Sequence, residues 1–241
     1  MIPIRDINPT RTFPIITISL IAINVVIFFG WQGWTQSTEM ENLDFLYKNA
    51  AIACELTSGD PLTDQEIQTG RCGQSGKLRF ETKHLFWSAA MSMFLHGGLL
   101  HLLGNIWFLW IFGNNIEEAY GLFGYLALYL AAGVASTAAF VLNNPDTTDP
   151  LVGASGAIAG VLGAYLVLFP THRVMSLLFI FFVPVSALLF LGLWFISQFF
   201  LADQSIAWEA HVAGFIFGVL TTLPLKQRLL SRIASLHAAL R

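Results

Sequence analysis

The sequence predicts an all-α membrane protein, a bundle of six transmembrane helices with both termini in the cytoplasm. Of its 241 residues, 55% are hydrophobic and only 11% are charged, whereas a soluble domain carries roughly 25% charged residues. The apolar residues form six helix-length segments, and these lack the alternating pattern of membrane barrel strands. The net charge of -3 provides no basic surface for nucleic acid, and the high hydrophobicity excludes intrinsic disorder.

The six apolar segments follow one another along most of the chain. They are Pro14–Gly30, Met93–Gly113, Gly121–Leu142, Val152–Phe169, Met175–Phe200 and Ile206–Leu225. Each is close to the roughly 17 to 25 residues that a helix needs to cross a bilayer. Because backbone polar groups cannot remain unpaired in lipid, each segment is predicted to be a helix.

The positions of the cations orient these helices. One side of the bundle carries Arg5, Arg11, Arg173, Lys226, Arg228, Arg232 and Arg241. The short loops 143–151 and 201–205 on the other side carry no Lys or Arg. The positive-inside rule therefore places both termini in the cytoplasm and predicts a multi-pass protein of the inner, cytoplasmic membrane of the cell.

This orientation divides the chain into parts with different expected roles. Residues 1–13 are a cytoplasmic N-terminus, residues 14–225 are the membrane domain, and residues 226–241 are a basic cytoplasmic tail. Apolar residues recur at helical spacing in the tail, at Leu229, Leu230, Ile233, Leu236 and Leu240. The tail is therefore either an amphipathic helix on the inner leaflet or a frayed extension.

A long extracytoplasmic loop, residues 31–92, is the polar part of the chain and holds both cysteines. Cysteines on this side of a membrane favour a disulfide, here between Cys54 and Cys72. Two unpaired thiols remain the alternative, because a sequence does not provide the separation of the two Cα atoms.

Strongly polar side chains interrupt three of the apolar segments, where they are costly and usually functional. They are His96, His101 and Asn105 in the second segment, Ser155 in the fourth and His211 in the sixth. These three segments all enter the membrane from the extracytoplasmic face. Ser155 and His211 are expected one to two turns inside their helices, with His101 and Asn105 slightly deeper. The polar groups thus share one level in the outer half of the membrane.

Small residues on two of these segments would allow the polar groups to meet. Glycines recur at a spacing of four, at Gly156 and Gly160 and at Gly214 and Gly218. Such faces let helix backbones approach closely, which would bring Ser155 within hydrogen-bond reach of His211. A serine beside an imidazole base is what nucleophilic acyl transfer requires. Taken singly, each feature has a structural explanation: a serine bonded to its own helix, an interhelical histidine bond, and glycine packing.

Three motifs occur in a fixed order on the second, fourth and sixth segments. They are His96-x4-His101-x3-Asn105, Gly153-Ala-Ser155-Gly156 and Ala210-His211-x2-Gly214-x3-Gly218. Together they resemble the motifs of the rhomboid family of intramembrane serine proteases, in its six-span prokaryotic form. The resemblance covers about residues 10–225, and each motif alone would be weak evidence.

The resemblance implies a serine endopeptidase that cleaves transmembrane segments near the extracytoplasmic side, where its site opens. Ser155 would be the nucleophile, and His211 would act first as general base and later as general acid. The Asn105 side chain, His101 and the backbone N–H of Ser155 would hold the oxyanion. The family uses a dyad without a third carboxylate, and it implies no cofactor and no metal.

Further positions match the family in supporting roles. Gly153 would leave room for the substrate backbone, while Gly156 and Gly214 would allow close helix contact; His96 and Gly218 complete the motifs. Glu117 occupies the position of a glutamate that ties spans together. The fifth segment, with Pro184 near its cytoplasmic end, would be the lateral gate for substrate, and we expect Trp194 and Phe195 to line it.

Two positions depart from the family pattern. Trp87 is followed by Ser88 instead of an arginine, which makes a Cys54–Cys72 disulfide a candidate brace for the long loop. Ala159 stands where an aromatic residue commonly stacks on the catalytic histidine. Another side chain must then orient His211, and we expect Phe215 or Trp208.

Two other functions compete with proteolysis. An inactive rhomboid-like protein that binds membrane partners would be marked by loss of Ser155 or His211, and both are present. A metal transporter using His96, His101 and His211 would need a ligand set that no His-Glu-x-x-His motif or nearby carboxylate completes. The predicted partners are therefore transmembrane protein substrates and the lipid bilayer, with no metal and no nucleic acid.

Overall fold

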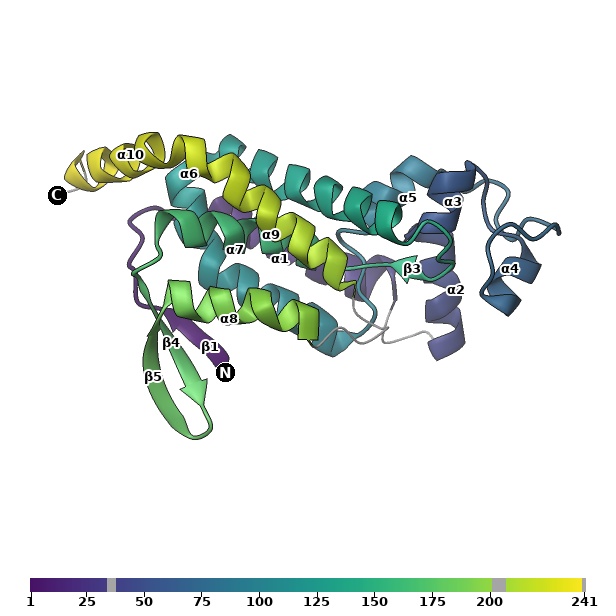
Figure 1. Ribbon diagram of the computed structural model, residues 1–241, viewed down its shortest axis with the longest axis horizontal. Coiled ribbons are helices and arrows are strands. Elements are labelled where there is room, and N and C mark those ends of the chain that lie inside the picture. Colours follow the sequence, from purple (N-terminus) through teal and green to yellow (C-terminus); the bar gives the residue numbers. More distant parts are fainter. Residues whose placement is uncertain (34–37, 201–206, 240–241) are drawn as a thin grey trace.

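The computed structural model describes residues 1–33, 38–200 and 207–239. The predicted loop 201–205, Ile206 at the start of the sixth predicted segment, and Leu240 and Arg241 of the tail lie outside the described residues. Within them the chain is mostly helical, with two small antiparallel sheets (Figure 1). The expected helical class is therefore right for most of the chain but omits these strands.

The elements fall into a helix bundle and a smaller group of short helices at one of its ends (Figure 1). In chain order they are β1 (Ile2–Asp6), α1 (Ile15–Val26), the π-helical turn η1 (Ile27–Trp31), α2 (Glu39–Asn49), β2 (Ala51–Ile52), α3 (Ala53–Ser58), α4 (Asp64–Thr69), α5 (Leu85–Met91), α6 (Leu99–Asn143), β3 (Pro150–Leu151), α7 (Ser155–Leu168), β4 (Arg173–Leu178), β5 (Phe181–Ser186), α8 (Ala187–Phe200), α9 (Trp208–Thr222), the 3-10 turn η2 (Leu223–Leu225) and α10 (Lys226–Ala239). Helices α2 to α5 belong to the predicted long loop and lie at the end opposite α10 (Figure 1).

The long helix α6 is two helices that fold back on each other. Its backbone leaves the helical region at Gly121, with φ 72° and ψ 172°, a conformation that glycine adopts without steric cost. Gly113 and Tyr125 would lie about 18 Å apart along a straight helix. A Cβ added at Gly113 would nevertheless come 2.6 Å from the Tyr125 hydroxyl. The two halves, 99–120 and 122–143, occupy most of the second and third predicted segments.

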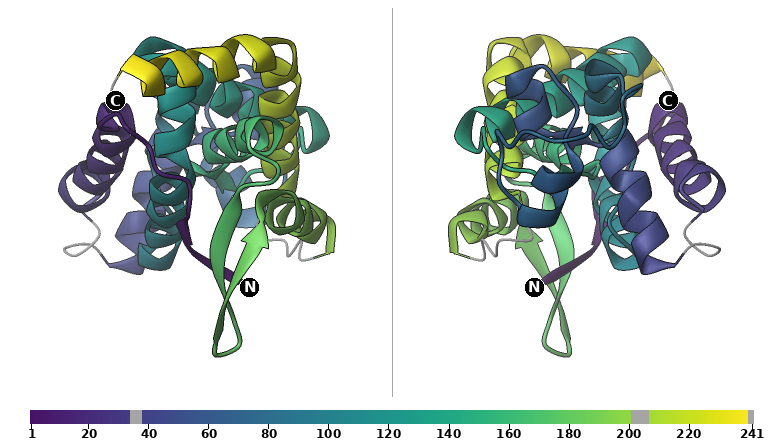
Figure 2. Two further views of the ribbon diagram at one scale, coloured as in Figure 1. Left: turned by 90° about the vertical axis from the view of Figure 1, so that its left-hand side faces the viewer. Right: turned by 90° about the vertical axis from the view of Figure 1, so that its right-hand side faces the viewer.

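The fifth predicted segment, Met175–Phe200, is only partly helical. Residues 173–186 form the β4–β5 hairpin, which pairs with β1 in the order β1-β4-β5 and projects from the bundle (Figure 2). The apolar composition of the segment is compatible with a strand as well as a helix, and Phe181, Phe182 and Val183 favour a strand. Pro184 lies on the edge strand, where a missing N–H is tolerated. Only Ala187–Phe200 forms a helix, α8.

The second predicted segment also begins later than expected. Met93–Gly98 precedes the helix, and α6 begins at Leu99 after the extended residue Gly98. His96 therefore lies before the helix, whereas His101 and Asn105 lie on it. Consecutive glycines at Gly97 and Gly98 disfavour helix and account for the delayed start.

By length and composition, two helices within the described ranges could cross a membrane. They are Leu99–Asn143 and Trp208–Ala239, the latter being α9 continued through η2 into α10. Shorter apolar helices occupy Ile15–Trp31, Leu85–Phe94, Ser155–Leu168 and Ala187–Phe200. Apart from the hairpin, the predicted segments thus contain apolar helices over most of their length, whereas Leu85–Phe94 lies almost wholly in the predicted long loop and Trp208–Ala239 continues into the predicted tail.

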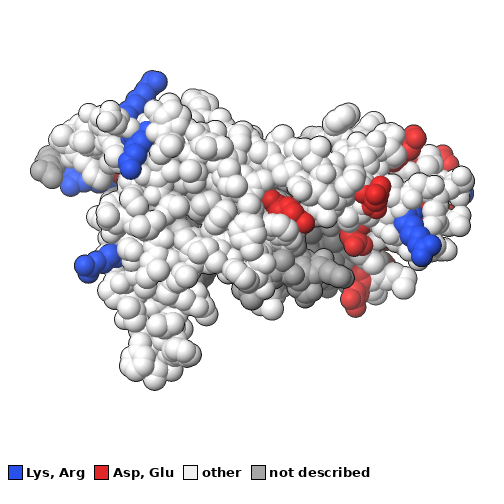
Figure 3. Space-filling model, viewed as in Figure 1, with Lys and Arg blue, Asp and Glu red and all other residues white. Residues whose placement is uncertain are grey.

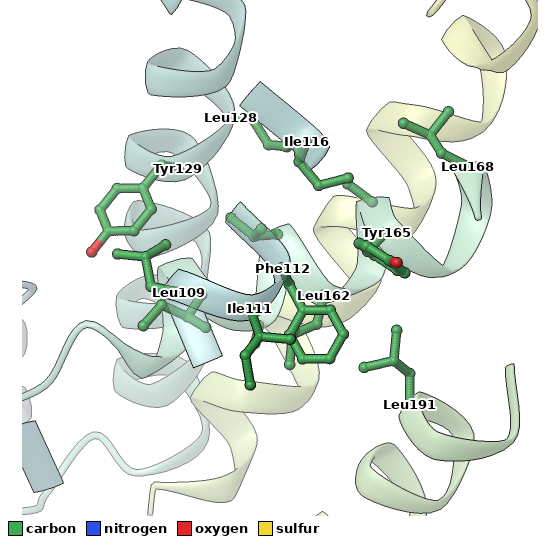
Figure 4. Close-up of a cluster of buried hydrophobic side chains, with 14 of the residues drawn as sticks. Leu109, Ile111, Phe112, Ile116, Leu128, Tyr129, Leu162, Tyr165, Leu168 and Leu191 are labelled. Atoms are coloured by element: carbon green, nitrogen blue, oxygen red, sulfur yellow. The ribbon is translucent and has the colours of Figure 1, made fainter. Parts of the chain in front are cut away.

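Helix α7 lies at the centre of the bundle, with α6 and α9 packed against it. It carries apolar residues all round, as expected for a helix enclosed by others, and almost every residue is buried. Figure 4 shows Leu162, Tyr165 and Leu168 of α7 packed among Phe112 of α6, Leu191 of α8 and their neighbours. Figure 3 shows a broad uncharged surface over this face of the bundle, with acidic side chains gathered mainly over the end that α2–α5 occupy.

The turn between the two halves of α6 holds the N-terminal helix through Glu117. This buried carboxylate accepts hydrogen bonds from Ile16 N (2.9 Å), Thr17 N (2.8 Å) and the Thr17 hydroxyl (2.8 Å). The first turn of a helix has N–H groups without partners in the helix, and an anion there is stabilised by them. Glu117 therefore joins α1 to α6, which is the structural tie that the family position implied.

The next carboxylate, Glu118, joins both ends of the chain to the same turn. Its Oε2 accepts from Arg11 N at 2.6 Å and Thr12 N at 2.8 Å, and its Oε1 lies 2.6 Å from His237 Nε2. Arg232 of α10 donates to the carbonyls of Glu118 and Ala119 at the end of the first half of α6. With Leu229 buried as well, α10 is a docked helix, and the frayed alternative for residues 226–239 is wrong.

The helices α2 to α5 are held by covalent and ionic links. Cys54 and Cys72 form a disulfide, which excludes the alternative of two free thiols. Lys83 forms an ion pair with Glu55 in which both side chains are buried, and Lys83 also donates to Tyr47 O at 2.7 Å. Burial raises the pKa of Glu55 and lowers the pKa of Lys83. For both groups, burial therefore disfavours the charged form more than the attraction between the two charges favours it.

Replacing Glu117 by Gln should weaken the attachment of α1. A glutamine has one acceptor oxygen, so some of the Ile16 and Thr17 donors would lose their partner. Each buried group left without a partner lowers the stability by roughly 1–3 kcal/mol. We expect a lower thermal unfolding midpoint in detergent micelles for Glu117→Gln. The exposed Glu81→Gln is the matched control, and an equal effect of the two substitutions would contradict this role of Glu117.

Replacing Lys83 by Met should destabilise the group α2–α5, because it leaves Glu55 charged, buried and without a cation. The expected loss is about 3–5 kcal/mol. Adding Glu55→Gln removes the charge while keeping an acceptor for Leu62 N, so the double variant should recover most of the loss. Thermal unfolding measures both variants, with the exposed Lys48→Met as control. A double variant no more stable than Lys83→Met would refute the argument.

Candidate functional site

Ser155 and His211 form the polar centre of the bundle. The Ser155 hydroxyl oxygen lies 2.8 Å from His211 Nε2, within hydrogen-bond distance. Ser155 belongs to α7 and His211 to α9, and 56 residues of sequence separate them. The pair therefore has the contact between hydroxyl and imidazole that the activation of a serine nucleophile requires.

Direct backbone contact between α7 and α9 makes this pair possible. A methyl group at Gly214 would overlap the carbonyl oxygen of Gly156, and one at Gly218 would overlap that of Gly160. Gly163 makes the same kind of contact with the carbonyl of Phe215. The two helices thus touch without intervening side chains, so short side chains can bridge them.

Ser155 was expected one to two turns inside its helix. It is instead the first residue of α7. Gly153 precedes it with φ 123°, a backbone conformation that side chains rarely adopt. The sharp turn places Ser155 at the end of the helix that has free N–H groups and a partial positive charge. The backbone N–H of Ser155 is thereby positioned where an anion would be stabilised.

His101 and Asn105 approach the same centre from α6. A Cβ added at Gly153 would lie 2.7 Å from His101 Nε2 and 3.4 Å from Ser155 Oγ, so this glycine keeps the space between them open. Asn105 donates one amide hydrogen to His101 O at 3.1 Å, and a primary amide carries a second. His101 is therefore close to Ser155, and Asn105 lines the same cavity.

His96 lies behind His101 and away from the dyad. Its ring is fully buried and packs edge-on against His101, with the ring centroids 5.2 Å apart. Gln32 bonds to the backbone of His96 at both N and O. His96 thus helps to hold the segment before α6, and the hydrogen-bond partners of the His211 nitrogens are Gln198 and Ser155 instead.

A cavity of about 1290 Å³ lies beside Ser155 and His211. Its lining includes Ser155, His211, His101, Asn105 and Gly153, together with residues of β3 and α8. A space of this size accommodates several residues of an extended peptide beside the serine. The polar groups therefore face a common space in which a substrate could bind.

Two residues of α8 surround the imidazole and were not assigned this role from the sequence. Gln198 Oε1 lies 2.8 Å from His211 Nδ1, and the Trp194 ring packs against the imidazole with centroids 6.3 Å apart. The expectation that Phe215 or Trp208 orients His211 is wrong, because Phe215 packs on Trp194 and Trp208 on Phe199. The spacing of four between Trp194 and Gln198, which places both on one helix face, was the available signal.

Comparisons with known proteins point to one family. The family model of the rhomboid domain matches residues 83–228. Rhomboid protease GluP of Bacillus subtilis is 39% identical over 92 residues, which cover 38% of this chain and 18% of the relative. Mitochondrial Rhomboid protein 1 of Saccharomyces cerevisiae is 35% identical over 137 residues, which cover 54% of this chain and 39% of the relative.

A plant protein is similar over a shorter stretch. RHOMBOID-like protein 5 of Arabidopsis thaliana is 36% identical over 80 residues, covering 33% of this chain and 26% of the relative. The chain therefore spans well under half the length of each of these three relatives.

Adding a methyl group at the helix contact should separate α7 from α9. In Gly214→Ala the new group would meet the carbonyl of Gly156 and approach the Ser136 hydroxyl at 2.6 Å. We expect a loss of about 1–3 kcal/mol in stability, because overpacking forces the backbones apart. Gly192→Ala on α8 is the matched control, since nothing lies within 4 Å of its Cβ. Equal unfolding midpoints for the two variants would contradict the close contact.

Proposed function

Since this chain belongs to the rhomboid family, we propose that it is an active serine endopeptidase that cleaves transmembrane segments of other proteins within the membrane. The observation that carries the proposal is the 2.8 Å contact between Ser155 Oγ and His211 Nε2 beside an open cavity. The names of relatives, among them a rhomboid protease, support the same class of reaction.

The proposed reaction begins with attack on the peptide carbonyl. Ser155 Oγ forms a bond to the carbonyl carbon while its proton passes to His211 Nε2. The oxyanion that results is stabilised by the backbone N–H of Ser155, the Asn105 amide and His101. Each such donor is typically worth about 100- to 1,000-fold in rate. His211 then gives its proton to the leaving amine, and the C–N bond breaks.

The second half of the reaction releases the other product. The acyl group remains on Ser155 as an ester, and His211 removes a proton from a water molecule as the water attacks this ester. Collapse of the second tetrahedral intermediate returns the proton to Ser155 Oγ and frees the new carboxyl terminus. The dyad is thus regenerated without a metal or a cofactor in any step.

We place six helices in the membrane: α1, the two halves of α6, α7, α8 and α9. The end with α10 would face the cytoplasm and the end with α2–α5 the outside, in agreement with the charge distribution in Figure 3. A disulfide in α2–α5 suits an oxidising compartment. Ser155, at the start of α7, would then lie near the extracytoplasmic side of the inner membrane, where the cavity opens.

The orientation also assigns a depth to the β4–β5 hairpin. Its tip carries the exposed residues Leu178, Phe179, Ile180, Phe181 and Phe182. Among the described residues, no strand pairs with the outer edge of β5, which disfavours a position in the hydrocarbon core. We therefore place the hairpin at the cytoplasmic interface of the bilayer, with its apolar tip toward the acyl chains.

Purified protein in liposomes that contain a generic transmembrane substrate tests the proposed reaction. Wild type should cleave it and should be labelled at Ser155 by a fluorophosphonate, whereas Ser155→Ala and His211→Ala should do neither. Asn105→Ala should reduce cleavage by about 100- to 1,000-fold. The exposed Ser235→Ala serves as control and should match wild type.

The possible results separate the competing functions. Cleavage that survives Ser155→Ala, or that stops only when a chelator is added, would refute the serine mechanism. Wild type that binds transmembrane substrates but neither cleaves them nor reacts with the fluorophosphonate would support the inactive rhomboid-like alternative.

A further inference from the structure

The second ring nitrogen of His211 has a partner on a different helix. Gln198 of α8 places its side-chain oxygen 2.8 Å from Nδ1, while Nε2 faces Ser155 at the same distance. The imidazole is thus held between α7 and α8, and both nitrogens have a defined neighbour. The sequence motifs contain the serine and the histidine, but they do not include this glutamine.

The contacts of Gln198 determine which end of its amide faces the histidine. Its Nε2 lies 2.9 Å from the carbonyl oxygen of Trp194 and 3.3 Å from the Ser197 hydroxyl. A carbonyl oxygen only accepts hydrogen bonds, so the NH2 group must face Trp194. The acceptor Oε1 is therefore the atom that faces His211 Nδ1.

This orientation in turn selects one tautomer of the imidazole. Because Gln198 Oε1 is an acceptor, Nδ1 must carry the hydrogen. In a neutral imidazole Nε2 is then unprotonated, and it is the atom 2.8 Å from the Ser155 hydroxyl. The ring is consequently ready to accept the serine proton without a change of tautomer.

We propose that Gln198 is a positioning residue that acts with Ser155 and His211 as the third member of a Ser–His–Gln relay. The inference rests on the proposed function. When His211 becomes positively charged during acyl transfer, the Gln198 oxygen accepts from the charged N–H, and such bonds are stronger than neutral ones. Gln198 thereby stabilises the imidazolium by a dipole rather than by a carboxylate.

The small residue one helical turn after the nucleophile explains why α8 supplies this support. Ala159 lies four residues after Ser155 on α7 and is fully buried, so α7 offers no aromatic ring to His211. Trp194 and Gln198, one turn apart on α8, instead pack against the ring and bond to it. The orientation of the base therefore depends on α8 being packed against α9.

Few other polar groups compete for the imidazole. Among the described residues, the other titratable side chains that line the cavity with His211 are His101 of α6, Glu209 of α9 and Asp149. Glu209 precedes His211 on α9, and its carboxylate lies 3.4 Å from the Asn144 amide. We therefore attribute the pH dependence of the relay to His211, and the experiment must measure the influence of His101 separately.

Kinetics of two Gln198 variants test the relay. Gln198→Met removes the acceptor and should lower kcat about 10- to 100-fold with little change in KM. Gln198→Glu keeps an acceptor and adds a negative charge that favours the imidazolium, so the acidic limb of kcat/KM should move to higher pH. Ile196→Met, an exposed change on the same helix, should have neither effect. If Gln198→Met alters only KM, Gln198 shapes substrate access and the relay is wrong.

A spectroscopic measurement tests the same contact without catalysis. Solid-state NMR of protein in lipid with ¹⁵N-labelled histidine should show His211 protonated at Nδ1 in wild type and a mixture of tautomers in Gln198→Met. The His211→Ala spectrum identifies the resonance, and His101→Ala measures the influence of that neighbour. A wild-type His211 protonated at Nε2 overturns the relay whether or not the protein is active. Failure to cleave, with Nδ1 protonated, would instead count against the proposed function alone.

Discussion

The direct backbone contact between α7 and α9 is the constraint on which the candidate site depends. Five glycines, Gly156, Gly160, Gly163, Gly214 and Gly218, leave no side chain between the two helices. A serine and a histidine are short, so they reach each other at 2.8 Å only when their backbones are this close. With α6 packed against it as well, α7 is buried along almost its whole length, and its first residue, Ser155, lines the cavity.

Polar interactions hold the remaining helices around this contact. Lipid tails are as apolar as the helices, so the hydrophobic effect contributes little to helix association in a membrane, and hydrogen bonds and close packing must supply it. Glu117 and Glu118 do so at one end of the bundle, where they join α1, the N-terminal segment and α10 to the turn of α6. At the opposite end the disulfide and the buried Lys83–Glu55 pair hold α2 to α5 together. Between these two ends lie the glycine contacts of α7 with α9 and the groups that face the cavity.

Two of the errors in the predicted fold and site have the same origin. Hydrophobicity measured along the chain records which segments avoid water, but it does not distinguish a buried strand from a helix. Residues 175–186 were therefore assigned to a helix although they form a hairpin whose edge strand accepts Pro184. The aromatic neighbour of His211 was sought on α9, at Phe215 or Trp208, whereas α8 supplies it through Trp194. Neither result follows from local pattern, because both depend on which elements pack together.

By itself the sequence determined the membrane class, most of the apolar helices, and the family, because these depend on composition and on motifs whose residues are fixed in order along the chain. It also indicated that both cysteines could pair and that two glycine faces could meet. Only the tertiary structure decided where α6 reverses, that residues 173–186 are a hairpin, and that Gln198 lies against Nδ1 of His211. These features depend on distances between residues far apart in sequence, and periodicity within one segment carries no information about the partner that another segment presents.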